Sequence, residues 1–147
     1  MARGAARGVG GVERSEDGGV TSPQSIVDSL CAAWERRDVE GILATLARDC
    51  AYRNIPLGTL VGTDAIRPFI VDFLGRWDAV EIVIVNTLSV GSLVMNERID
   101  RFSRGGIVFD LPVAGVFEVA DGRVARWTDY WDLGTWQAEQ RAKGGRR

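Results

Sequence analysis

The sequence predicts an α+β domain in which helices cover one face of a curved, mainly antiparallel sheet. Two observations predict it: apolar side chains recur at helical spacing over residues 22–74, and from Val80 onward their period changes to two. Helices followed by strands are typical of the α+β class. The length of 147 residues indicates one domain that can bury a core without a metal or a disulfide.

Both ends of the chain are expected to lie outside this domain. Residues 1–21 hold six of the 18 glycines and almost no large apolar side chains, so they cannot bury enough surface to offset the entropy of ordering. The last ten residues are polar. We therefore expect a flexible N-terminal tail over 1–21, a single domain over 22–137 and a polar C-terminal tail over 138–147.

Three helices are predicted in the first half of the chain. Ser22 and Pro23 form a start signal for the first, because a capping hydroxyl precedes a proline at the first helical position. Asp38 can cap the second helix and Thr63 the third. The apolar side chains that follow at helical spacing are Ile26, Val27, Leu30, Cys31, Trp34, Val39, Ile42, Leu43, Leu46, Ile66, Phe69, Ile70, Phe73 and Leu74. A short extended segment is expected at 51–55, before Pro56.

Four strands are predicted in the second half, near 79–90, 92–102, 107–119 and 123–133. The Asp-Gly pair at 121–122 is a strong hairpin signal and joins the last two strands. The strand at 107–119 is largely apolar on both faces, whereas a sheet with one wet face should alternate more cleanly. We therefore expect the face away from the helices to be covered as well, most simply by a second copy of the chain.

The composition excludes several kinds of chemistry. The chain has no histidine, so a histidine-dependent triad, a histidine-liganded metal centre and a histidine base are all impossible. Its one lysine, Lys143, lies in the polar C-terminal stretch, where Schiff-base chemistry is not expected. An enzyme with this composition must use carboxylates, tyrosine and arginine. Cys31 and Cys50 lack CxxC spacing and are expected to be buried free thiols.

The charge and hydropathy of the chain also bear on partners and location. The body of the chain is acidic, which argues against a nucleic-acid surface. No apolar run approaches the roughly 20 residues of a membrane span, and the first 20 residues lack the apolar region of a signal peptide. We therefore expect no nucleic-acid or membrane partner, and a cytoplasmic location.

The period-two alternation of the predicted strands places three sets of polar residues among apolar neighbours. Asp129 shares a strand face with two tryptophans, which predicts a partly desolvated carboxylate. Arg98 and Asp100 share a face at a backbone spacing of about 6.5–7 Å, near enough for an ion pair. Tyr52 and Asn54 share a face of the short segment at 51–55. Two of the three have an ordinary alternative: a tyrosine can be core and an arginine–aspartate pair can be a structural ion pair.

Together these motifs resemble the limonene-epoxide hydrolase family. The matching segments are Tyr-Arg-Asn-Ile-Pro at 52–56, Glu-Arg-Ile-Asp at 97–100, Gly-Val-Phe at 115–117 and Trp-Thr-Asp-Tyr-Trp-Asp-Leu at 127–133. The resemblance runs from about residue 24 to 136. It implies an α+β fold with a curved mixed, mainly antiparallel sheet packed by three to four helices, shared with nuclear-transport-factor-like and ketosteroid-isomerase-like proteins. It also implies a homodimer, a deep apolar pocket, and epoxide opening by water without cofactor or metal.

The resemblance also implies a role for each polar residue. Asp129 would be the general base, Tyr52 and Asn54 would help it hold the attacking water, Asp100 would protonate the epoxide oxygen, and Arg98 would lie between the carboxylates. Independently of the resemblance, one protonated and one ionised carboxyl group can supply both the acid and the base that epoxide hydrolysis needs. The apolar residues on the same strand faces, expected to form the pocket walls, are Phe102, Leu111, Val113, Trp127 and Trp131.

The residues leave two alternatives, and the chain departs from the family pattern in two places. The alternatives are an isomerase or cyclase on the same fold, which would use an aspartate base on a carbon acid, and a non-catalytic module that binds an apolar ligand. One departure is Trp131, which stands where the family commonly has a smaller aromatic side chain, and the other is the hairpin at 103–106, which is shorter than in a family member. Both affect pocket shape and therefore the choice of epoxide, with a cyclic or terpenoid epoxide expected.

Overall fold

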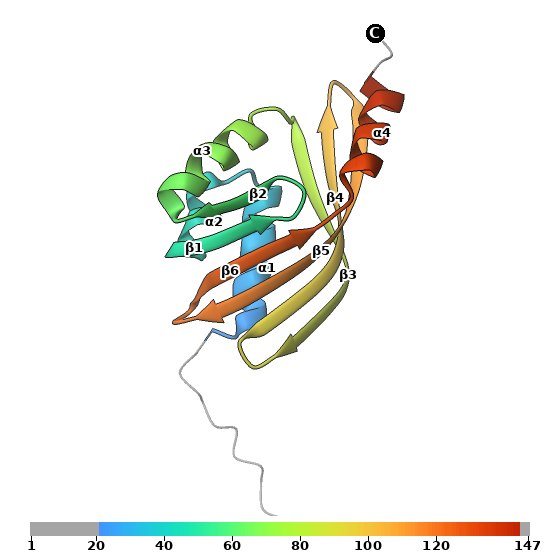
Figure 1. Ribbon diagram of the computed structural model, residues 1–147. Helices are drawn as coiled ribbons and strands as arrows, with labels where there is room; N and C mark the ends of the chain where they lie inside the picture. The colour runs from blue at the N-terminus through green and yellow to red at the C-terminus, as the bar shows by residue number, and fades with distance from the viewer. Residues whose placement is uncertain (1–20, 145–147) are drawn as a thin grey trace, which may run out of the picture.

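The computed structural model describes residues 21–144, and these form a six-stranded sheet with four helices (Figure 1). The expected α+β class with a curved mixed sheet is confirmed. The flexible tail expected over 1–21 lies, except for Thr21, outside the described residues. The elements are α1 Pro23–Glu35, α2 Val39–Ala44, β1 Leu46–Asn54, β2 Gly58–Val61, α3 Thr63–Leu74, β3 Ala79–Val90, β4 Leu93–Arg104, β5 Ile107–Ala120, β6 Arg123–Tyr130 and α4 Leu133–Gly144.

The strand order is β2-β1-β6-β5-β4-β3, and β3 to β6 form the expected antiparallel meander. The one parallel pairing joins β1 to β6, the first strand to the last. It sets Tyr52 opposite Trp127 and Asn54 opposite Asp129. The short segment that carries Tyr52 is therefore fixed beside the strand that carries Asp129. The two are far apart in the sequence: Asn54 and Trp131, the residue that directly follows β6, are separated by 77 positions.

Two of the three expected helix caps are confirmed. The Ser22 hydroxyl oxygen accepts the Ser25 backbone N–H at 3.2 Å, and Asp38 Oδ1 accepts that of Gly41 at 2.9 Å. Thr63 is not a cap: it is the first helical residue, and the cap position is Gly62 at φ +88°. Glycine suits this position because a side chain would be strained at such a φ, and the turn from β2 into α3 requires it.

The extended segment expected at 51–55 belongs to a longer strand, β1, which begins at Leu46. Leu46 was expected on the inward face of the second helix, but α2 ends at Ala44 after six residues. The strand β2 was not predicted. It has four residues, three of them exposed, so it carries no apolar alternation that could reveal it.

The last predicted strand was too long at its C-terminal end. It stops at Tyr130, and Leu133 begins α4, which crosses the expected domain boundary at 138 and continues to Gly144. Asp132 accepts the Thr135 backbone N–H at the start of α4, which favours a helix there. Helix α4 buries no residue fully, so it has no apolar stripe by which to predict it. Lys143 donates to the Val108 carbonyl at 2.9 Å and pairs with Glu139, so it is held against β5.

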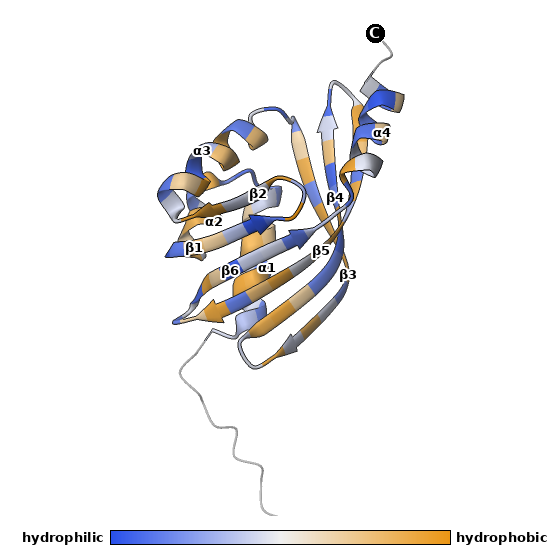
Figure 2. Cartoon of the chain, in the orientation of Figure 1, coloured by the Kyte–Doolittle hydropathy of each residue, from blue (hydrophilic) through white to orange (hydrophobic). Residues whose placement is uncertain are grey.

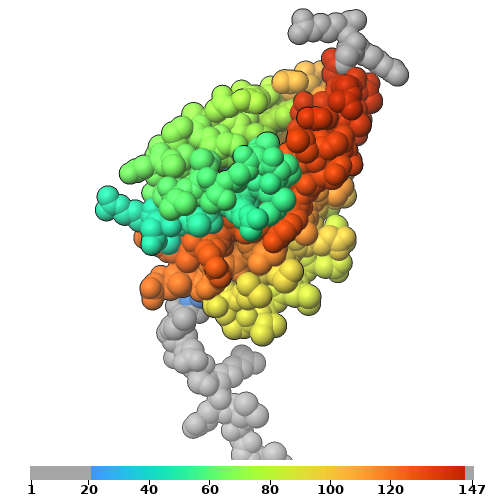
Figure 3. Space-filling model, in the orientation of Figure 1, coloured from blue at the N-terminus to red at the C-terminus, as the bar shows by residue number. Residues whose placement is uncertain are grey.

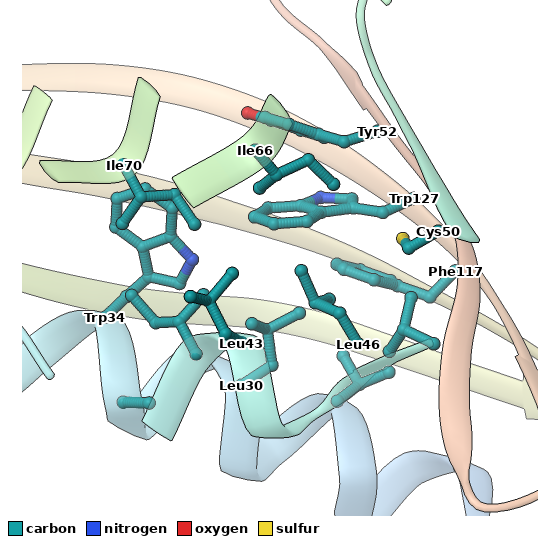
Figure 4. Close-up of a cluster of buried hydrophobic side chains, with 14 of the residues drawn as sticks. Leu30, Trp34, Leu43, Leu46, Cys50, Tyr52, Ile66, Ile70, Phe117 and Trp127 are labelled. Atoms are coloured by element: carbon teal, nitrogen blue, oxygen red, sulfur yellow. The ribbon is translucent and has the colours of Figure 1, made fainter. Parts of the chain in front are cut away.

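The core lies between the inner face of the sheet and helices α1 to α3 (Figure 4). Trp127 stacks between two rings, Tyr52 at a centroid distance of 4.1 Å and Phe117 at 5.9 Å. Leucines and isoleucines of the helices pack around this stack. Both cysteines are free thiols; Cys50 is buried as expected, whereas Cys31 is only half-buried. Among residues 21–144, no helix is both long and apolar enough to cross a bilayer.

The outer face of the sheet carries apolar side chains that nothing in the described chain covers. Figure 2 shows apolar residues interspersed along β3, β4 and β5, and the exposed ones include Leu88 at 71%, Val90 at 78% and Met95 at 43%. Figure 3 shows this side of the molecule, with α4 in red lying beside β5. We call the surface formed by Val85, Leu88, Val90, Leu93, Met95 and Val108 the outer apolar face.

Candidate active site

A cavity of about 280 Å³ lies between the inner face of the sheet and the helices. Its volume is near the lower end of the roughly 300–1,000 Å³ common for ligand pockets. The rim includes Leu57, Asp72, Arg76 and Leu133. These residues come from the β1–β2 turn, α3 and its C-terminal end, and α4, which meet at the centre of the view in Figure 3. The opening is therefore bordered by segments that are far apart in the sequence.

The structure brings all ten sequence-predicted site residues to this one cavity. The polar group is Tyr52, Asn54, Arg98, Asp100 and Asp129. The expected wall residues are Phe102, Leu111, Val113, Trp127 and Trp131. Of the polar five, the three charged residues are nine-tenths or more buried, and so is Tyr52. The arrangement is a small apolar chamber in which the polar side chains form the floor; we call Arg98, Asp100 and Asp129 the charged floor.

Arg98 bridges the two carboxylates of that floor. Its Nε donates to Asp100 Oδ1 at 2.7 Å, and its Nη2 donates to Asp100 Oδ2 at 3.3 Å and to Asp129 Oδ1 at 3.0 Å. Its Nη1 donates to Asn96 Oδ1 at 2.9 Å. Three buried acceptor groups therefore fix the position of the planar guanidinium. This arrangement fits the rigid fork of an arginine better than the flexible ammonium of a lysine.

Gly115 makes this bridge possible. Strand β5 lies between β4, which carries Arg98, and β6, which carries Asp129, and Gly115 is paired with residues of both strands. A Cβ at Gly115 would overlap Arg98 Nη1 and would lie 2.7 Å from a Phe117 ring carbon and 2.8 Å from Asn96 Oδ1. The glycine thus leaves the space through which the arginine reaches across one strand to the next.

The buried charges change the protonation of the cluster. Burial raises the pKa of the Asp100 carboxyl above its usual range, although the Arg98 charge and hydrogen bond act in the opposite direction. Burial disfavours the Arg98 cation, but the Asp129 and Asp100 charges outweigh that effect and raise its pKa. Burial therefore favours Asp100 as a protonated acid.

Within residues 21–144, side-chain hydrogen bonds reach only one of the two carboxylate oxygens of Asp129. Its Oδ1 accepts the Trp127 indole N–H at 2.8 Å as well as Arg98 Nη2 at 3.0 Å. Neither of these bonds uses Oδ2, so that oxygen is available to accept a proton in the cavity. Trp127 was expected only as an apolar wall, and the structure makes it also a hydrogen-bond donor to this carboxylate.

Tyr52 and Asn54 lie next to Asp129 across the parallel strand pair. Asn54 Nδ2 donates to the Tyr52 hydroxyl oxygen at 3.0 Å, and the Trp131 indole N–H donates to Asn54 Oδ1 at 2.7 Å. Burial, followed by the Asp129 charge, raises the pKa of the Tyr52 phenol well above its ordinary value. Tyr52 is therefore a neutral hydroxyl, suited to hydrogen bonding with water rather than to nucleophilic attack.

Several residues of the site were not predicted as such. Asn96 could have been, because period two places it on the same strand face as Arg98. The walls from α1 and α3 could not, because their side chains follow the same apolar spacing as any core residue; they are Leu30, Cys31, Trp34, Phe69 and Phe73. Trp136 was missed because α4, which carries it, has no apolar stripe. Burial raises the pKa of the Cys31 thiol to about 12, so this cysteine is a neutral part of the wall.

The described residues contain no cluster of three or more cysteine, aspartate or glutamate side chains placed to hold a metal ion. The acidic groups on the floor of the cavity are Asp100 and Asp129, and both already accept hydrogen bonds from Arg98. The polar groups therefore suit proton transfer between a carboxylic acid, a carboxylate and a water molecule.

Sequence comparison places this site within one family. The family model of the limonene-1,2-epoxide hydrolase catalytic domain matches residues 21–140. The epoxide hydrolase EphG of Mycobacterium tuberculosis (strain ATCC 25618 / H37Rv) is 30% identical over 107 residues, which cover 73% of this chain and 71% of EphG. The region that the family model matches contains every residue of the charged floor.

Solved structures share the fold. A limonene-epoxide-hydrolase-like epoxide hydrolase from M. tuberculosis superposes with a TM-score of 0.74 at 26% identity, covering 84% of this chain and 92% of that one. A candidate SnoaL-like polyketide cyclase from Shewanella denitrificans OS-217 also reaches a TM-score of 0.74, at 15% identity, over 82% of this chain and 98% of its own. The second likeness concerns the fold alone, whereas the family match extends over the sequence of the site. The chain belongs to the limonene-1,2-epoxide hydrolase family.

Proposed function

We propose that this protein is a cofactor-independent epoxide hydrolase that adds water to an apolar cyclic or terpenoid epoxide and releases a vicinal diol. The observation that carries the proposal is the buried bridge of Arg98 between Asp100 and Asp129 in an apolar cavity. Such a bridge is costly to bury, and it provides one acidic and one basic carboxyl group within reach of the same small molecule.

In this reaction one carboxyl group takes a proton from water, and the other gives a proton to the epoxide oxygen. Asp129 Oδ2 removes a proton from water while the water oxygen bonds to an epoxide carbon. The bond from that carbon to the epoxide oxygen breaks, and Asp100 gives its proton to the oxygen that leaves. Tyr52 and Asn54 hold the water beside Asp129. No charge is left on the product, because one proton has been removed and one has been delivered.

The site must then return to its starting state. After turnover Asp129 holds a proton taken from water, Asp100 has given its own proton to the product, and Arg98 lies in hydrogen-bond contact with both carboxyl groups. We propose that a proton passes from Asp129 to Asp100 along this contact or through water beside it, while the permanent charge of Arg98 stabilises whichever carboxylate is ionised. An Arg98→Lys enzyme that kept the parent rate would remove the basis of this step.

The walls support an apolar substrate. Phe102, Leu111, Val113 and Trp127 are all buried and present no charge to the cavity. The polar groups lie together on the floor, so an epoxide would face them while its hydrocarbon part contacts the walls. The bulk of Trp131 at the cavity favours a compact ring over a long chain.

We further propose that the enzyme is a homodimer that buries the outer apolar face. Exposed leucine, valine and methionine side chains on adjacent strands are typical of a surface that another protein covers. Sedimentation equilibrium would show a dimer of the parent, and Leu88→Lys should shift it toward monomer. A parent that sediments as a monomer at micromolar concentration would contradict this proposal.

One assay tests the proposed reaction. The purified protein is incubated with limonene oxide or cyclohexene oxide in heavy-oxygen water, beside Asp129→Asn and, as a matched control, Asp110→Asn on the outer face. We expect a diol that carries the heavy oxygen from the parent and from Asp110→Asn, and none from Asp129→Asn. Addition of a chelator should not change the parent rate.

The same assay separates the alternatives. An isomerase or cyclase would give a rearranged product without label, and a ligand-binding module would bind the epoxide and release it unchanged. Either result across a panel of epoxides would overturn the proposed hydrolase activity.

A further inference from the structure

Two tryptophans of the cavity donate their indole N–H groups to polar groups of the floor. Trp127 donates to the base, Asp129, and Trp131 donates to Asn54. The second bond joins Trp131 to the pair that holds the water in the proposed reaction. Trp131 therefore does more than occupy space in the wall.

The indole N–H decides how the Asn54 amide is turned. An indole nitrogen donates a hydrogen bond and cannot accept one, so the Asn54 atom that faces Trp131 at 2.7 Å must be the carbonyl oxygen. The amide nitrogen then faces the other way, toward the Tyr52 hydroxyl oxygen at 3.0 Å. A phenylalanine at position 131 would leave both orientations of the amide available.

The amide in turn decides where the Tyr52 proton points. The NH₂ group of Asn54 is a donor only, so the Tyr52 oxygen accepts from it and cannot give its own proton back to Asn54. Tyr52 is 4% exposed, and Asn54 is its one hydrogen-bond partner within the part of the chain that the structure describes. The free side of the hydroxyl is the cavity, where Asp129 lies.

We propose that Trp131 is a positioning residue that fixes the direction of a hydrogen-bond chain, from Trp131 through Asn54 to Tyr52, so that the Tyr52 hydroxyl donates into the cavity. The proposal rests on the proposed function, because the acceptor is the water that Asp129 deprotonates. That water accepts the Tyr52 proton on one lone pair and keeps the other for the epoxide carbon. Its own proton is then directed to Asp129 Oδ2.

Kinetics with matched variants test the chain. Replacing Trp131 by benzothienylalanine exchanges the N–H for sulfur at nearly constant size, whereas Trp131→Phe removes the N–H and part of the wall. Loss of one such hydrogen bond corresponds to a fall in kcat of about fivefold. We expect that fall in both variants, with KM changed mainly in Trp131→Phe. An unchanged kcat in the benzothienylalanine enzyme would overturn the proposal.

A double-mutant cycle separates direction from wall shape. Tyr52→Phe should cost less in the Trp131→Phe background than in the parent, because the tyrosine proton is no longer aimed. Trp136→Phe serves as the control: Trp136 also lines the cavity, but its indole N–H makes no hydrogen bond to any of the residues 21–144. Tyr52→Phe should cost the same with or without that change. Additive effects in both cycles would contradict the proposal.

A spectroscopic readout keeps this inference separate from the proposed function. In nitrogen-15 spectra the Trp131 indole signal should move upfield and lose protection from exchange in Asn54→Ala, while the Trp136 signal stays in place. The Asn54 amide protons should show cross-relaxation with the Tyr52 ring. A parent that opens no epoxide but shows these signals would overturn the hydrolase proposal alone. Active parent protein with an unchanged Trp131 signal in Asn54→Ala would overturn the chain alone.

Discussion

Arg98 and Arg101 lie three residues apart on β4, point to opposite faces of the sheet, and each bridges two carboxylates. Arg101 donates from Nε to Asp110 at 2.7 Å and from Nη1 to Glu81 at 3.2 Å. Arg98 contacts Asp100 and Asp129 at similar distances. The Arg98 side chain is 4% exposed and the Arg101 side chain 36%. The two clusters therefore differ in burial far more than in geometry.

This difference in burial reverses the direction in which the pKa of the neighbouring carboxyl group is shifted. On the outer face the hydrogen bond from Arg101 lowers the pKa of Asp110, as expected for an ion pair beside water. On the inner face burial raises the pKa of Asp100 in spite of an equally close arginine. An arginine beside an aspartate thus makes a solvated ion pair in one place and an acid that can hold a proton in the other.

The largest effect is expected from removing the base in the buried cluster. Asp129→Asn removes the group that takes the water proton, and general base catalysis is worth roughly 10²–10⁴-fold in rate. We expect kcat for cyclohexene oxide to fall by about 10³-fold. The matched change on the outer face, Asp110→Asn, should leave kcat within about twofold, since surface ion pairs contribute little. Comparable losses in the two variants would show that the clusters do not differ in function.

The contrast between the faces was predictable from the sequence, but its consequences were only partly so. Period two assigns Arg98 and Asp100 to one face and Arg101 to the other. It does not state which residues of distant strands stand opposite each other, so the contact from Arg98 to Asp129 across Gly115 needs the register of three strands. The tryptophan N–H bonds were missed because an aromatic residue on an inward face is equally well explained as a wall.

Helix α4, strand β2 and the pairing of β1 with β6 were harder to predict for a physical reason. Helix α4 and strand β2 have no strongly apolar face, and the parallel pairing of β1 with β6 depends on contacts between opposite ends of the chain. Local periodicity carries no information on any of these features. The sequence therefore predicted which residues form the site, as sets that share a strand face, but it did not predict that α4 borders the cavity.

Stability should show the next largest difference between the clusters. Arg98→Gln leaves two buried carboxyl groups without their counter-charge, and breaking a buried pair in this way typically costs about 3–5 kcal/mol in the free energy of unfolding. Arg101→Gln breaks a solvated network and should cost less than about 1 kcal/mol. Urea unfolding at neutral pH measures both. Equal losses would mean that burial does not distinguish the two arginines energetically.

A smaller loss is expected from closing the space that Arg98 occupies. Gly115→Ala places a methyl group against Arg98 Nη1, a Phe117 ring carbon and Asn96 Oδ1, and overpacking of this kind costs about 1–3 kcal/mol. Because the arginine must move, kcat should fall together with stability. Gly134→Ala is the control, since its added Cβ would meet only Asp132 Oδ1 at 3.4 Å, an ordinary contact. Gly115→Ala with the stability and kcat of the parent would show that the guanidinium does not need this space.

The smallest effect is a change of rate with pH, of about tenfold for each pH unit above the pKa of the buried acid. The folded protein holds the pKa of Asp100 above its unfolded value. The acid is therefore fully protonated below the unfolded value, and its protonation is lost as the pH rises through the folded value. Catalysis and the contribution of Asp100 to folding stability should both decline as the pH rises.

Two variants test whether Asp100 is the group responsible. The pKa of Asp110 is shifted in the opposite direction, so Asp110 is already ionised over this range, and Asp110→Asn should leave the basic limb of the kcat profile in place. In Asp100→Asn, by contrast, the residual rate should lose that limb. If the limb survives in Asp100→Asn, the proton that reaches the epoxide oxygen comes from another group, and the contrast between the buried and the solvated cluster does not explain the chemistry.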